Sequence, residues 1–513
     1  MLVKTYSAAV NGLEVNIVTI ETSVESGQST VLTGLGDEAV KESLSRIRTA
    51  FVYNHYKYPN KGITINLSPA NLRKAGSGFD LPIAISLLAA NGGMIDDMLN
   101  DYLLMGELGL DGKLKPVKGA LPVAILARKL KYKGFIVPKE NEMEAAVVNN
   151  LDVYGMETFQ EVVQFLSGQI DRKPMVFDTR KVFYEQQYKC ELDFIDVKGQ
   201  ENVKRAMEVA AAGGHNLIMV GPPGSGKSMV AKRLPSILPP LTLAESLETT
   251  QIYSVAGKLP AGTSLISQRP FRAPHHTISQ VALVGGGNTP QPGEISLAHN
   301  GVLFADELPE FNKATLEVLR QPLEDRHVTI TRSKYSVDFP CSFMFVASAN
   351  PCPCGYYGDP THNCICTPSQ RHRYMSKISG PLMDRVDIQC EIQPVPFKDI
   401  SSVKEGEKSE QIRERVINAR KIQAERYKDF KGIHCNAQMT ESMIHQFAEP
   451  DEEGIEMLRV AMERMSLSAR AYNRILKVAR TIADLDASPN VRLSHLAEAI
   501  SYRNLDRGDW AER

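Results

Sequence analysis

Apolar residues recur with two different periods through the first ~165 residues, a length typical of one domain. Short β-type runs occupy 13–20, 62–67 and 135–137. Between them, the segment 37–53 carries apolar residues three and four positions apart, as the buried face of a helix does. Those residues are Val40, Leu44, Ile47 and Phe51. The alternation predicts an α/β domain.

A second set of apolar runs begins after residue 194. The runs 216–220, 301–305 and 343–349 are continuous, which is typical of buried parallel strands, and glycine or polar residues follow each of them. A chain of 513 residues exceeds what one hydrophobic core usually serves, so we expect two or three domains. The predicted units are 1–165, a polar, proline-containing linker at 166–194, an α/β core at 195–395 and a helical region at 396–513.

The last region has helical periodicity throughout. Segment 409–426 carries apolar residues on one face and arginines on the other, and segment 467–484 carries a second apolar face. The predicted buried residues are Ile412, Val416, Ala419 and Ile422 in the first helix, and Ile475, Val478, Ala479 and Ile482 in the second.

A glycine-rich loop follows the first of the continuous strands directly and precedes a helical pattern. In such a loop, backbone N–H groups surround a β-phosphate, Lys227 supplies a point charge and the Ser228 hydroxyl can bind Mg²⁺. The alternative is an ordinary glycine turn, but the strand before it and the helix after it favour a nucleotide triphosphate site. The loop consists of Gly221, Pro222, Pro223, Gly224, Ser225, Gly226, Lys227 and Ser228.

Two acidic residues end the second continuous strand, 301–305. Asp306 is the candidate Mg²⁺ ligand, and Glu307 is the candidate that orients the attacking water, since phosphoryl transfer depends mainly on positioning and charge stabilisation. Alone, the pair would fit an ordinary strand-to-helix cap. Its position downstream of the phosphate loop favours the catalytic interpretation.

Several segments together resemble one family. The stretches 34–43, 74–84 and 106–112, the phosphate loop and the acidic pair resemble the ComM/YifB family of Mg-chelatase-like AAA+ ATPases. The resemblance covers nearly the whole chain. It implies an α/β P-loop AAA+ core with a C-terminal helical lid, preceded by an α+β domain similar to the Lon protease domain (ribosomal S5-like).

The resemblance also implies residue roles. Val197 and its neighbouring backbone would contact the adenine of ATP, Asn350 would be the first sensor, and Arg470 would be the second sensor. Arg385 would be the arginine finger that reaches a neighbouring subunit, a role worth several kcal/mol in such enzymes, with Arg371 and Arg373 as rivals. A finger acting between subunits implies a homo-oligomer, and relatives are usually hexameric rings.

The Lon-like domain is predicted not to be a protease. Aligning 74–80 on the Lon-type serine motif places Gly78 at the nucleophile position, with Ser77 one residue away. Aligning 114–121 places Leu121 at the position of the catalytic lysine, with Lys118 three residues away. A serine nucleophile and its base must be within hydrogen-bond reach, and neither is in register.

A hairpin is predicted at 327–339, where apolar and polar residues alternate on both sides of a polar tip. In the family this hairpin would point toward the ring pore. Arg332 and Lys334 could then bind phosphates while Tyr335 stacks on a base, which makes these three residues the candidates for DNA binding.

Four cysteines lie just after the predicted first sensor, as the pairs Cys352, Cys354 and Cys364, Cys366. Four thiolates in a short loop could bind Zn²⁺. Free thiols are the open alternative, because the chain has no apolar stretch long enough for a membrane and no signal pattern, and we therefore expect it in the reducing cytoplasm without a membrane partner.

The charge balance excludes little. With 59 basic and 60 acidic residues, a nucleic-acid partner would have to bind local patches. The resemblance implies an ATP-driven ring motor acting on single-stranded or branched DNA, in branch migration or helicase work on recombination intermediates during natural transformation. The alternatives are a magnesium-chelatase-type motor subunit that remodels a partner protein for metal insertion, and a DNA-binding scaffold without catalysis.

Overall fold

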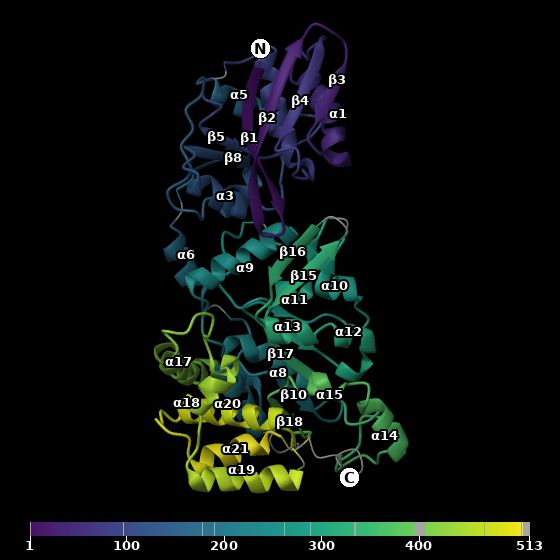
Figure 1. Cartoon of the computed structure of the whole chain (residues 1–513), viewed down its shortest axis with the longest axis vertical. Coiled ribbons are helices and arrows are strands. Elements are labelled where there is room, and N and C mark those ends of the chain that lie inside the picture. The colour runs from purple at the N-terminus through teal and green to yellow at the C-terminus, as the bar shows by residue number, and fades with distance from the viewer. Residues whose placement is uncertain are drawn as a thin grey trace.

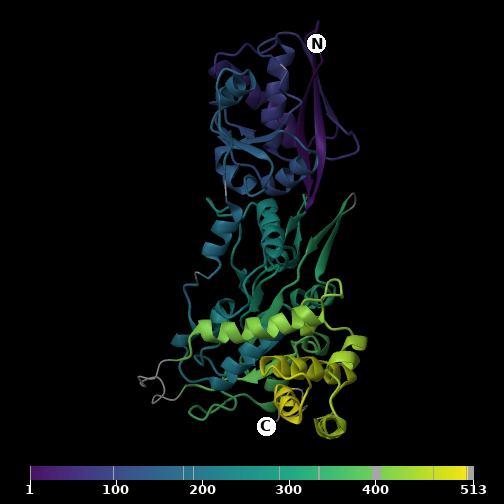
Figure 2. The same cartoon turned by 90° about the vertical axis from the view of Figure 1, so that its left-hand side faces the viewer.

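The protein is elongated, with its two ends formed by different parts of the chain (Figures 1 and 2). The N-terminal unit occupies one end, the C-terminal helices occupy the other, and the nucleotide-binding core lies between them. The computed structural model describes residues 2–95, 97–176, 178–188, 190–260, 262–287, 289–332, 335–395, 406–465, 467–503 and 505.

The N-terminal unit is built on a mixed seven-stranded sheet. Its helices are α1 (Glu38–Tyr53), α2 (Asp80–Ala90), α3 (Ala120–Lys129), α4 (Glu142–Ala145) and α5 (Phe159–Leu166). The predicted helix over 37–53 is confirmed, and the Asp37 carboxylate caps it by accepting from the Val40 N–H. The strand order is β3 (Thr30–Thr33), β4 (Gly62–Ser68), β2 (Glu14–Glu25), β1 (Leu2–Asn11), β5 (Tyr102–Leu104), β8 (Gly134–Pro138), β9 (Asp152–Met156).

The core carries a five-stranded sheet whose neighbouring strands are all parallel. The helices α7 (Glu201–Gly213), α8 (Lys227–Arg233) and α9 (Leu243–Ala256) belong to this unit. In a parallel sheet all strands end at one edge, here called the carboxyl edge, and begin at the opposite, amino edge. The strand order is β11 (Phe271–Arg272), β14 (Val302–Ala305), β17 (Met344–Ala349), β10 (Leu217–Val220), β18 (Ile388–Glu391).

The predicted hairpin is present as β15 (His327–Arg332) paired with β16 (Tyr335–Pro340). The stretch predicted to be a linker contains the helix α6 (Thr179–Gln186), in which Phe183 is buried. Smaller helices complete the core. They are α10 (Gln280–Val284), α11 (Glu294–Leu297), α12 (Lys313–Glu317), α13 (Arg320–Asp325), α14 (Pro368–Met375) and α15 (Gly380–Met383).

The C-terminal helices share a hydrophobic core with the sheet rather than forming a separate bundle, since Ile412 and Ile475 belong to the same buried cluster as Leu217. All predicted buried positions of α20 are buried. In α17 the prediction was wrong for Ile422, which is 37% exposed, because the helix instead buries Gln423, whose amide donates to the Ala212 carbonyl at 3.1 Å. The helices are α17 (Ser409–Arg426), α18 (Glu441–Phe447), α19 (Glu452–Met465), α20 (Ala469–Leu485) and α21 (Leu493–Ser501).

The turn between β1 and β2 reaches down onto the β15–β16 hairpin (Figure 1). Gly12 lies in this turn at φ +63°, and a Cβ there would stand 2.1 Å from Val337 Cγ1. The Gly119 N–H also donates to the Ser254 carbonyl of α9 at 3.2 Å. The N-terminal unit is therefore docked on the core, partly through the hairpin.

Among the described residues, no helix combines the length and the apolar character needed to cross a membrane.

Candidate functional site

The phosphate loop leaves β10 at the carboxyl edge and enters α8 at Lys227. Gly221 is required by a close approach, because a Cβ there would stand 2.1 Å from the Ile392 carbonyl oxygen. Gly224 and Gly226 have φ +77° and +92°, which L side chains rarely adopt, and the space beside both is open. Their conformation turns the backbone N–H groups into the anion-binding concavity expected of such a loop.

Lys227 is nearly buried and its ammonium is held inside the loop. It donates to the carbonyls of Gly221 and Pro222 at 2.7 and 2.8 Å, and to Asn350 Oδ1 at 3.2 Å. Burial lowers the pKa of Lys227 to about 8, although the carboxylates of Asp306 and Glu307 act in the opposite direction. A desolvated cation of this kind would be stabilised by a phosphate.

Asp306 and Ser228 meet across the loop, as the sequence predicted for a Mg²⁺ site. The Ser228 hydroxyl donates to Asp306 Oδ2 at 2.6 Å, so two hard oxygen ligands already lie together at the phosphate loop. This donor set fits Mg²⁺, which proteins bind through one or two carboxylates plus phosphate oxygens.

Ser348 was missed by sequence reasoning. Its hydroxyl donates to Asp306 Oδ1 at 2.5 Å and accepts from the Glu307 N–H at 3.0 Å, so one side chain orients both acids. The available signal was a polar residue inside a strand that is otherwise apolar and fully buried. Glu307 itself is exposed and has φ +54°, an uncommon conformation for a non-glycine residue and one that clusters at functional sites.

The structure does not place the side chain of Val197, the predicted adenine contact, in a cavity beside the phosphate loop. Val197 is buried against the core, and neither of two cavities beside the phosphate loop has it in its lining. Gln200, three residues later, joins this segment to the phosphate loop, because its side-chain amide donates to the Ser225 carbonyl at 3.5 Å as well as to the Gln393 carbonyl at 2.5 Å. The first cavity, of about 220 Å³, has apolar and aromatic walls from Pro351, Tyr357, Ile392 and Leu505.

Arg385 and Arg470 lie at the amino edge, away from the phosphate loop. Arg385 is paired with Glu324, and Arg470 contacts the carboxylate of Asp384 at 3.0 Å. Residues 384 and 385 precede β18, which runs parallel to β10 with Ile388 beside Leu217. The length of β10, roughly 10 Å at ~3.3 Å per residue, therefore separates them from their own phosphate loop.

The rival finger residues belong to α14. Arg371 stacks on the ring of Tyr357 at 4.0 Å from its centroid, and Arg373 is exposed. Because Tyr357 lines the cavity beside the phosphate loop, α14 lies close to the nucleotide site of its own chain.

The candidate DNA contacts lie at the tip of the hairpin. The backbones of Arg332 and Tyr335 form the last pair of the β15–β16 ladder. Lys334 lies outside the residues that the structure describes, as do the side chains of the other two.

The four clustered cysteines converge. Their sulfur atoms all lie within 4.8 Å of one another. Cys352 Sγ is 3.3 Å from Cys354 Sγ and 3.7 Å from Cys364 Sγ, and Cys354 Sγ is 3.6 Å from Cys364 Sγ. Ligands about 2.3 Å from a tetrahedral Zn²⁺ would be ~3.8 Å apart, so the cluster, completed by Cys366, fits this ion.

In the Lon-like unit, Ser77 and Lys118 contact different residues. The Ser77 hydroxyl donates to Glu107, while Lys118 lies against Gly257 at the boundary with the core. Gly78 and Leu121 occupy the aligned catalytic positions, and neither carries a nucleophile or a base.

Comparisons with known proteins give matches over nearly the whole chain. The family model described as Subunit ChlI of Mg-chelatase matches residues 20–141, Magnesium chelatase, subunit ChlI matches 193–400, and its C-terminal model matches 406–503. Competence protein ComM of Haemophilus influenzae is 42% identical over 505 residues, 98% of this chain and 97% of that protein. Uncharacterized protein YifB of Escherichia coli is 42% identical over 508 residues, again 98% and 97%. Lon protease 2 of Bacillus subtilis is 32% identical over 157 residues, 28% of this chain and 27% of that protein.

Proposed function

The chain belongs to the ComM/YifB family of Mg-chelatase-like AAA+ proteins, and from this premise we propose that it hydrolyses ATP to move DNA strands. The convergence of Lys227, Ser228 and Asp306 at one edge of the sheet carries the ATPase part. The DNA part rests on full-length similarity to a protein named for competence. The specific activity proposed is branch migration or helicase action on recombination intermediates during natural transformation.

We propose a task for each residue of the site. The phosphate loop and Lys227 bind the phosphates, and Ser228 with Asp306 would hold Mg²⁺, which supplies charge neutralisation when bound. Glu307 accepts the proton of the attacking water and fixes its orientation. Asn350 contacts Lys227, which supports its proposed role as the sensor of the γ-phosphate.

We propose that the amino edge of one subunit completes the site of the next. Arg385 and Arg470 are at the wrong edge to serve their own phosphate loop, so both would act between subunits of a ring, with a hexamer as the proposed state. Mixing Lys227→Ala chains with Arg385→Ala chains should then restore part of the activity that each lacks alone. No recovery on mixing would refute the assignment.

We propose Zn²⁺ for the cysteine cluster. Its loop packs on the phosphate loop, since a Cβ on Gly355, at φ +86°, would stand 2.7 Å from Pro223 Cδ. A metal that fixes Cys352 and Cys364 would stiffen this support and the cavity wall at Tyr357.

ATPase rates with and without forked or four-way DNA, across a salt series, test the proposal. Glu307→Gln should lower kcat about 100-fold or more, whereas Glu310→Gln, an exposed glutamate three residues away, should not. DNA should stimulate the wild type most at low salt, because phosphate contacts are salt-dependent. Lys334→Ala should keep the basal rate and lose the stimulation. A wild-type rate that DNA leaves unchanged even at low salt would exclude the DNA motor.

A further inference from the structure

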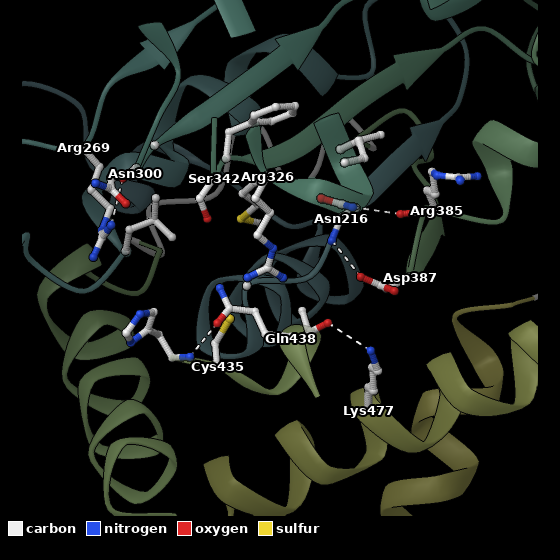
Figure 3. A pocket seen from close by; sticks show the side chains of 18 of the residues that line it. Asn216, Arg269, Asn300, Arg326, Ser342, Arg385, Asp387, Cys435, Gln438 and Lys477 are labelled. Carbon is white, nitrogen blue, oxygen red and sulfur yellow. Dashed lines mark hydrogen bonds between the residues drawn. The ribbon is translucent and has the colours of Figure 1, made fainter. Parts of the chain in front are cut away.

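A third cavity, of about 400 Å³, lies between the amino edge of the core sheet and the helices α17 and α20 (Figure 3). We call it the amino-edge cavity. Its volume is in the range of small-ligand sites. The cavity lies at the start of β10, whereas the phosphate loop follows the end of that strand. Residues that define it include Asn216, Arg326, Ser342, Arg420, Cys435 and Lys477.

The cavity carries more positive than negative charge. Six lysine or arginine side chains and three carboxylates line it. All three carboxylates are already engaged: Glu245 pairs with Arg269 at 3.2 Å, Glu324 with Arg385, and Asp387 with Arg474. Asp387 also faces His215 at 3.4 Å; although burial opposes its ionisation, Arg474 and His215 hold its pKa well below the usual range.

Within the part of the chain that the structure describes, three of these cations pair with no carboxylate. Arg326 has no hydrogen bond or ion pair from its side chain among the described residues, and its guanidinium points into the cavity toward Cys435 and Gln438 (Figure 3). Lys477 Nζ donates to the Ala437 carbonyl at 3.1 Å. Arg420 donates to the Ala211 carbonyl at 3.1 Å, and its buried Nε has no hydrogen-bond partner within the described part of the chain.

This arrangement is costly unless an anion enters. Burial penalises the charged form of both Arg326 and Lys477, and it lowers their pKa. A buried charge is normally compensated by a counter-ion or by several hydrogen bonds. Arginine and lysine donors that converge in a partly desolvated site suit phosphate oxygens in particular.

We propose that the amino-edge cavity binds a small phosphate anion through Arg326, Arg420 and Lys477. The anion is either free in solution, as pyrophosphate or the phosphate tail of a nucleotide, or it belongs to a nucleotide bound by a neighbouring copy of the chain. The cavity lining contains no residue of the chain's own phosphate loop, so the binding of a free anion does not require that loop.

The free-anion source is tested with pyrophosphate and the full chain carrying Lys227→Ala, which disables the phosphate loop. Calorimetric titration should give saturable binding that Arg326→Gln or Lys477→Gln weakens at least 10-fold. Lys421→Gln, an exposed lysine beside Arg420 on the same helix, is the matched control and should leave the affinity unchanged. In phosphate-free buffer Arg326→Gln should also raise Tm, because it removes an uncompensated cation.

The second possibility, that the phosphate belongs to a nucleotide bound by a neighbouring copy, is tested with chains whose phosphate loop is unchanged. If pyrophosphate does not bind, but Arg326→Gln and Lys477→Gln weaken ATP-dependent assembly while Lys421→Gln does not, the phosphate comes from the adjacent copy. If pyrophosphate does not bind and assembly is insensitive to all three variants, the proposal is wrong. Since the first arm uses no ATP turnover, its failure is distinguishable from failure of the proposed motor.

Discussion

The depressed pKa of Lys227 makes the stability of the nucleotide-free protein depend on pH in a calculable way. The usual pKa of a lysine is near 10.4, and burial lowers that of Lys227 to about 8. Between these values the unfolded chain binds a proton that the folded chain does not, so stability from this group rises with pH. Lys227→Met has no titrating group and loses this rise.

The size of the effect follows from the two pKa values. From pH 7 to pH 9.5 the free energy of unfolding of the wild type should gain about 2 kcal/mol relative to the Met variant. For a domain of about 150–250 residues this corresponds to a change of roughly 4–8 °C in the difference between their Tm values. Other titrating groups are common to both proteins and cancel in that difference.

Differential scanning calorimetry at pH 7 and pH 9.5, without nucleotide or Mg²⁺, measures the change in the Tm difference between wild type and Lys227→Met. Lys232→Met on the same helix is the matched control, because that side chain is exposed and should show no such change. A Tm difference between wild type and Lys227→Met that stays constant from pH 7 to pH 9.5 would refute the desolvated-lysine argument.

The same argument predicts proton uptake when a triphosphate restores the charge of Lys227. At pH 8.5 about three-quarters of free chains would carry the neutral amine, so binding should consume ~0.7 proton per site. Calorimetric titrations in buffers of different ionisation enthalpy report this number directly.

Three further substitutions test the site and its supports. Ser348→Ala should raise the Mg²⁺ concentration needed for half-maximal ATPase about 10-fold, because it frees the Asp306 carboxylate; the buried Ser296→Ala should not, and equal effects would contradict the assignment. Gly12→Ala should lower Tm by imposing a strained φ, worth about 1–2 kcal/mol, and a clash with the hairpin, and an unchanged Tm would argue against that docking contact. Cys354→Ser should reduce zinc content from one ion per chain, as measured by mass spectrometry, whereas the exposed Cys190→Ser should retain it; a wild-type chain without zinc would exclude the metal site.

Much of the nucleotide site could be predicted from the chain itself because its chemistry is local. A glycine loop between a strand and a helix places Lys227 and Ser228 by short-range geometry alone. An apolar run ending in Asp306 predicts a second strand. The carboxyl ends of parallel strands lie at the same edge of a sheet, so Asp306 is expected near the phosphate loop. The hairpin and the helix over 37–53 were likewise set by periodicity within a few residues.

Other features were decided only by packing. The sequence marks Ser348 only as a polar residue in an apolar strand, and its contacts with Asp306 and Glu307 follow from the pairing of β14 with β17. Helix rotation against α7 buried Gln423 in place of Ile422, since a hydrogen-bond partner was available there.

The placement of the arginines shows the same division. The sequence determines the charge of Arg326, Arg420 and Lys477 and the local secondary structure around each of them. It does not show that they lie together, because up to 151 positions separate them along the chain. Only the docking of the C-terminal helices on the amino edge brought them to one cavity, and only the parallel sheet put Arg385 on the far side from Lys227. The sequence gives the charge of each residue. The electric field at a ligand site is the sum of the contributions of all nearby charges, and only the folded chain sets their positions.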